Sequence, residues 1–93
     1  MTTNEILINL IYDSTNGYCY YCGKRLSFHN YGAVGARGAW EIDHFIPLSR
    51  NGAHQLWNFV PACVDCNTRK SDLMPWEFDP SRFAHGERTA DRC

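Results

Sequence analysis

The sequence predicts a small α+β fold in which a helix, a cysteine-bearing turn, two short strands and a second helix follow one another. A helix-capping pattern opens the chain, two widely separated Cys-x-x-Cys pairs frame its middle, and an alternating apolar segment lies between them. A chain of 93 residues with 44% hydrophobic side chains has room for one modest core. We therefore expect residues 1–93 to form a single domain.

The first helix is expected from about residue 3 to residue 14. Thr2 and Glu5 have the spacing of a capping box, and apolar residues recur at helical spacing after them. The run Ser-Thr-Asn-Gly at 14–17 ends this pattern. We assign residues 1–17 to a helix that adds to the core.

Two strands are expected in the middle of the chain. Residues 40–46 alternate between apolar and polar side chains, and Pro47 ends them. Residues 56–60 are apolar and aromatic, and Pro61 is expected to close this second strand. A loop with three glycines at 30–39 precedes the strands.

The second helix is expected over residues 64–73. Asp65 lies in its first turn, basic residues lie late in it, and Pro75 follows its end. Residues 74–93 are assigned to a C-terminal tail, which frays from residue 84. Three aromatic residues of the tail are expected to fold back onto the core: Trp76, Phe78 and Phe83.

Four of the five cysteines form two Cys-x-x-Cys pairs, Cys19 with Cys22 and Cys63 with Cys66. Four thiolates at about 2.3 Å satisfy the tetrahedral preference of Zn²⁺, and a closed set of four indicates a structural metal. Such a site contributes on the order of 10 kcal/mol of binding free energy to folding, which would support a small core. Buried thiols, disulfides or a redox pair are weaker alternatives, since an odd cysteine count leaves one unpaired. Cys93 is expected to take no part.

A chemically distinctive pattern begins at Asp43-His44 and ends in the second cysteine pair. It continues with Pro47-x-Ser49, then Asn58, then Cys63-x-x-Cys66-Asn67-x-x-Lys70. Over residues 18–73 the chain resembles the HNH endonuclease family. The resemblance implies a ββα-metal, treble-clef-like fold with a structural zinc, and metal-dependent hydrolysis of DNA that leaves 5′-phosphate and 3′-hydroxyl ends.

Phosphodiester hydrolysis needs an activated water and a cation on the phosphate oxygens. The imidazole of His44 can accept a proton from water near neutral pH, while Asp43 and Asn67 offer oxygen ligands for a divalent cation. The resemblance implies the same roles: His44 as general base, Asp43 and Asn67 on a catalytic Mg²⁺, Mn²⁺ or Ni²⁺, and Asn58 fixing the loop after the base. Asn67 stands where many members of the family have His. Strict strand alternation would separate Asp43 from His44, so the strand must end or twist there.

Candidate DNA contacts are the basic side chains of Arg50, Arg69 and Lys70. Between residues 24 and 70 six basic residues face three acidic ones, although the whole chain has a net charge of −1. This balance favours weak, salt-sensitive contact with the phosphate backbone and low sequence specificity.

The remaining polar candidates lie outside the motif. We treat His29, His54 and His85 as surface residues, His54 being the best candidate for an extra ligand or phosphate contact. Glu41 either tunes the metal or only makes a hydrogen bond.

Two other functions stay open on the sequence. One is a noncatalytic treble-clef zinc module that binds nucleic acid or protein, and the other is an enzyme that acts on RNA or another phosphodiester. We expect DNA as the main partner, with a protein partner or a homodimer as a second recognition surface. No membrane contact is expected, and the location is expected to be cytoplasmic, in a bacterial or phage-host cell.

Overall fold

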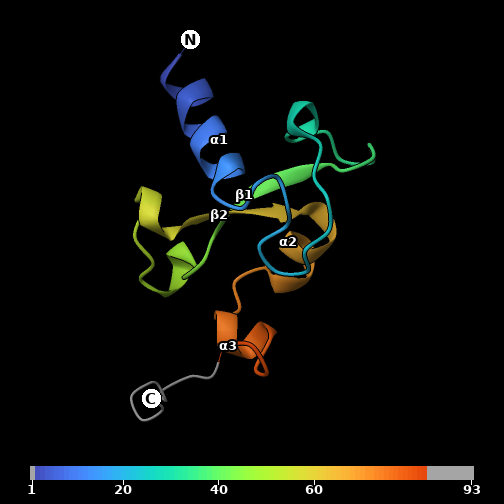
Figure 1. The fold of residues 1–93 in the computed structure, drawn as a ribbon. Coiled ribbons are helices and arrows are strands. Elements are labelled where there is room, and N and C mark those ends of the chain that lie inside the picture. The colour runs from blue at the N-terminus through green and yellow to red at the C-terminus, as the bar shows by residue number, and fades with distance from the viewer. Residues whose placement is uncertain (1, 84–93) are drawn as a thin grey trace.

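The computed structural model describes residues 2–83, and Figure 1 shows the arrangement of its elements. The predictions for residues 84–93, with His85 and Cys93, lie outside the described residues. In chain order the helices and strands are α1 (Thr3–Asp13), β1 (Trp40–His44), β2 (Phe59–Cys63), α2 (Val64–Lys70) and α3 (Pro75–Phe78). This is the predicted α+β order, with one short helix added after α2.

The capping box predicted for α1 is present. The Thr2 hydroxyl accepts from the backbone N–H of Glu5 at 3.1 Å, and the Glu5 carboxylate accepts from the N–H of Thr2 at 2.7 Å. One face of the helix packs against β2 and buries Ile11, while Tyr12 lies in ring contact with Trp40. The helix is therefore confirmed as an element that supports the core.

The two strands pair antiparallel, but the second lies later in the chain than expected. β2 begins at Phe59 and runs through Pro61, and residues 56–58 form a 3-10 turn instead. The predicted end at Pro61 was wrong because Pro61 occupies a non-hydrogen-bonded pair opposite Ile42, where no N–H is needed by β1. Its carbonyl accepts from the N–H of Tyr20, which ties the first cysteine turn to the sheet.

α2 ends at Lys70, three residues before the predicted end. Ser71 leaves the helix with a positive φ of 49° and a ψ of −123°. A serine rarely adopts this conformation, because its Cβ crowds the backbone there. Lys70, the last helical residue, is fully buried.

The first cysteine pair lies in a small hairpin. The N–H of Cys19 donates to the carbonyl of Lys24 at 2.8 Å, and Gly23, just after the second cysteine, has a positive φ of 78° that glycine adopts without steric cost. Phe78 and Phe83 fold back and make ring contacts with the aromatic residues of this turn, as expected. Within residues 2–83 the structure contains no helix that is both long and apolar enough to cross a membrane.

Candidate active site and metal centre

The four predicted zinc ligands come together between the first hairpin and the start of α2. The sulfur atoms of Cys19, Cys22, Cys63 and Cys66 all lie within 4.8 Å of one another, and the four thiols are free. Cys63 caps α2, because its sulfur accepts from the N–H of Cys66 at 3.4 Å. Four sulfur donors in a closed cluster fit Zn²⁺, so the centre joins hairpin, β2 and α2 at one point.

A second site lies where β1 ends beside α2. Asp43, His44 and Asn67 line one cavity of about 240 Å³, together with residues of the loop after β1. His44 is the last residue of β1; it lines the same cavity as Asp43 and also borders a second cavity with His54 and Phe59. Sequence analysis missed Asp72, which lines the cavity from the segment after α2.

Asp43 is almost fully buried, with 6% of its surface exposed. Its Oδ2 atom accepts a hydrogen bond from the Tyr21 hydroxyl at 2.5 Å and lies 3.2 Å from the Lys70 ammonium. Burial, and then the hydrogen bond to Asp43, raise the pKa of Tyr21 above its ordinary value. The phenol therefore stays protonated and acts as the donor.

Lys70 does not lie on the surface where its phosphate contact was predicted. Its side chain is fully buried, and its ammonium donates to the carbonyl of His44 at 3.1 Å while pairing with Asp43. The ring of Tyr21 lies 5.8 Å from the same nitrogen. The expectation for Lys70 is corrected, because the fold uses this charge to neutralise a buried carboxylate.

His44 is paired with a second imidazole. Its Nε2 atom lies 3.0 Å from Nδ1 of His54, the two rings stack, and Phe59 packs edge-on against both. Burial, and then the positive charge that His54 can carry, lower the pKa of His44, against the opposing effect of Asp43. A neutral imidazole with one nitrogen engaged is suited to accept a proton.

Asn58 is fully buried and holds the loop that follows His44. Its Oδ1 accepts from the N–H of Ile46 at 2.8 Å, and its Nδ2 donates to the carbonyls of Ile46 and Ala53. Gly52 allows the loop to close, because a Cβ there would lie 1.8 Å from the carbonyl oxygen of Ile46. Asn58 lies away from solvent, so its geometry is that of a positioning residue.

Two of the predicted DNA contacts are exposed and ion-paired. Arg50 pairs with Glu77 at 2.5 Å, and Arg69 pairs with Asp65 at 3.3 Å one turn earlier on α2. Exposed pairs of this kind contribute little to stability, so a phosphate can compete for either guanidinium.

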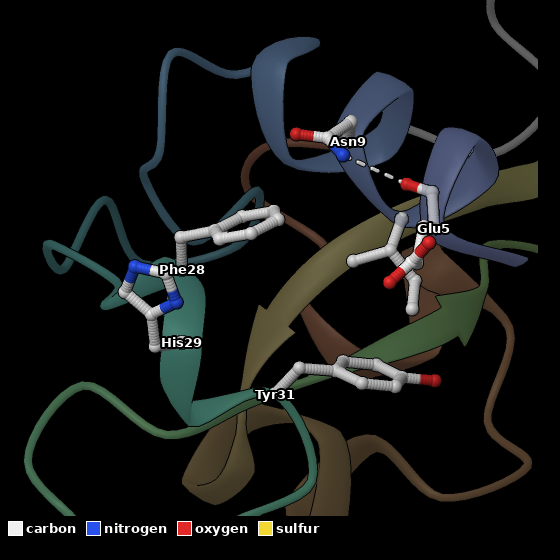
Figure 2. A pocket seen from close by; sticks show the side chains of 6 residues that line it. Glu5, Asn9, Phe28, His29 and Tyr31 are labelled. Carbon is white, nitrogen blue, oxygen red and sulfur yellow. Dashed lines mark hydrogen bonds between the residues drawn. The ribbon is translucent and has the colours of Figure 1, made fainter. Parts of the chain in front are cut away.

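The other sequence candidates lie elsewhere. His29 lines a separate hollow of about 570 Å³ between α1 and the segment 28–31, where Phe28 and Tyr31 face Glu5 of the helix (Figure 2). Glu41 does not line the cavity of Asp43; its charge, after burial, helps to raise the pKa of Tyr31.

Comparison with protein families gives a match over the segment that contains both the cysteine cluster and the cavity of Asp43. The family model described as HNH endonuclease matches residues 19–73, which is more than half of the chain. The matched segment contains both cysteine pairs, β1 with Asp43 and His44, and α2 with Asn67. The chain belongs to the HNH endonuclease family.

Proposed function

We propose that the protein is a metal-dependent endonuclease that hydrolyses DNA phosphodiester bonds with low sequence specificity. Membership of the HNH family supports nuclease activity in general terms. The observation that carries the proposal for this chain is the shared cavity of Asp43, His44 and Asn67. A carboxylate, an imidazole and an amide around one opening are the groups that this reaction needs.

Asp43 and Asn67 would hold the catalytic cation. A carboxylate oxygen and an amide carbonyl are hard ligands that suit Mg²⁺ or Mn²⁺, and Ni²⁺ is compatible with the adjacent imidazole. Such a cation would neutralise charge on the phosphate and on the leaving oxygen. With two protein ligands, the remaining coordination positions are left to water and to the phosphate.

His44 would act as the general base. In the tautomer in which Nε2–H of His44 donates to Nδ1 of His54, Nδ1 of His44 is the ring nitrogen that can accept a proton from water. Asn58 fixes the loop that directly follows His44, through three hydrogen bonds to backbone atoms of that loop. Arg50 and Arg69 would contact phosphates of the bound strand.

The test is cleavage of supercoiled plasmid by the wild type and by His44→Ala, each with Mg²⁺, Mn²⁺, Ni²⁺ or EDTA. We expect cleavage by the wild type with a divalent cation and a loss of about 10²–10⁴-fold in His44→Ala, because a general base contributes that much. His29→Ala is the matched control, since His29 lines the separate hollow. Full activity of His44→Ala with any metal would favour the noncatalytic zinc module, and an equal loss in His29→Ala would refute the assignment of His44 as the base.

A further inference from the structure

Three polar groups are buried together behind the cavity that would hold the catalytic cation. Tyr21 is 7% exposed, Asp43 is 6% exposed, and Lys70 has no exposed surface. Tyr21 comes from the hairpin of the first cysteine pair, Asp43 from β1 and Lys70 from the last position of α2. Three separate segments of the fold therefore each contribute one group.

Both partners contact the same atom of the carboxylate. The hydroxyl of Tyr21 donates to Oδ2 of Asp43, and the ammonium of Lys70 lies 3.2 Å from that oxygen. With Oδ2 engaged from inside the core, the second oxygen of the group is the one left for a ligand in the cavity.

We propose that Tyr21 and Lys70 are positioning residues that hold Asp43 so that one carboxylate oxygen is presented to the catalytic cation. This inference rests on the proposed function, since it assumes a cation in the cavity of Asp43 and Asn67. Partners that hydrogen-bond to metal ligands fix the ligand's orientation, and losing one typically weakens metal affinity by about 10–100-fold.

Lys70 also links the cation ligand to the base. Its ammonium donates to the backbone carbonyl of His44, the residue next to Asp43. The ammonium of Lys70 thus holds the end of β1 at two residues, Asp43 and His44, which are the proposed cation ligand and the proposed general base. It also compensates the charge of Asp43, which would be costly to bury alone.

Tyr21 connects the zinc centre to the same carboxylate. It lies between Cys19 and Cys22, so the hairpin that presents two sulfur ligands also places the phenol. Ordering of this hairpin by zinc would therefore set the position of a group that acts at the second metal.

The test measures Mn²⁺ affinity of the zinc-loaded full chain without DNA, by electron paramagnetic resonance of free Mn²⁺, for Tyr21→Phe and Tyr20→Phe. Each change removes one phenol oxygen from the same hairpin, but Tyr20 makes no hydrogen bond to Asp43 in the described structure. We expect Tyr21→Phe to bind Mn²⁺ about tenfold more weakly and Tyr20→Phe to match the wild type within about twofold. Zinc content and circular dichroism should be unchanged in both.

Equal Mn²⁺ affinity in Tyr21→Phe and Tyr20→Phe would overturn the inference, as would a wild type that binds no Mn²⁺. Lys70→Met keeps an unbranched side chain, one atom shorter, without the charge, and it should also weaken Mn²⁺ binding; wild-type affinity there would remove Lys70 from the proposal. Because binding is measured without DNA, the result is separate from cleavage. Weaker binding by Tyr21→Phe in a protein that cuts no DNA would support the positioning role and refute the nuclease.

Discussion

At the scale of single residues, the neighbours Asp43 and His44 differ in the side chains that contact them. His44 follows Asp43 directly in the sequence, yet its ring pairs with His54 while the Asp43 carboxylate pairs with Tyr21 and Lys70. Neighbours in the chain are thus given separate roles, one suited to proton transfer and the other to holding a cation.

His54→Ala should lower the rate of DNA cleavage by about 10- to 100-fold, because the base would lose the contact that fixes its ring. The Michaelis constant should change much less, since His54 does not line the cavity of Asp43 and Asn67. Steady-state cleavage of a labelled duplex gives both constants, with His29→Ala as the control. A change confined to the Michaelis constant would assign His54 to phosphate contact instead.

Ser71→Gly should stabilise the protein by about 1 kcal/mol, because glycine adopts a positive φ without steric cost. For a domain of this size that free energy raises the melting temperature by about 4–8 °C, measurable by calorimetry. Ser14→Gly is the matched control: Ser14 has an ordinary φ of −61°, so glycine there should lower stability. No gain in Ser71→Gly would mean that the serine conformation is not strained.

At the scale of elements, the four-cysteine cluster is placed where a bound zinc ion would compensate for a small core. The sheet has only two strands, and α2 has only seven residues, so neither would be stable alone. The cysteines join the hairpin to the start of α2, which then reaches β1 through Lys70. A single metal ion at this cluster would thereby fix the elements that carry the second site.

Cys19→Ser should leave the chain largely unfolded, because loss of one ligand removes much of the metal's contribution to folding. Circular dichroism and zinc content by mass spectrometry test this, and Cys93→Ser, which changes the cysteine that belongs to neither Cys-x-x-Cys pair, should keep zinc and fold. Well-folded Cys19→Ser without zinc would refute a structural role for the metal. Loss of zinc in Cys93→Ser would instead refute the ligand assignment.

At the scale of the whole molecule, charge is nearly balanced and many basic groups already have partners. The net charge is −1, Arg50 and Arg69 are ion-paired at the surface, and Lys70 is buried. The surface left for DNA is therefore smaller than the sequence count of basic residues suggested. Contacts with the phosphate backbone should dominate, and affinity should be weak.

Arg50→Gln and Arg69→Gln should each weaken DNA binding and reduce the slope of log affinity against log salt by about 1, as loss of one phosphate contact requires. Arg25→Gln is the control, since Arg25 bonds the carbonyl of Asn16 and stacks on Tyr18. Fluorescence anisotropy at several salt concentrations gives the slopes. Unchanged slopes in both variants would place the DNA on another face.

The spacing of the cysteines was enough to predict the four-sulfur cluster, and the resemblance to the HNH family predicted the trio of Asp43, His44 and Asn67. Ligand chemistry is a property of residue type, and short motifs such as Cys-x-x-Cys place their members within one turn of chain. The capping box of α1 was predictable for the same reason, because its hydrogen bonds span three residues.

Tertiary structure decided the burial of Lys70, the hydroxyl contact of Tyr21 and the pairing of His54 with His44. The partners of Lys70 and Tyr21 are more than twenty residues away in the chain, and none of the three contacts follows from a helical or strand period. The course of β2 through Pro61 likewise depended on its register with β1. The sequence by itself thus determined which groups can bind metal and move a proton, while packing between distant segments determined which of them are presented to a substrate and which hold the others in place.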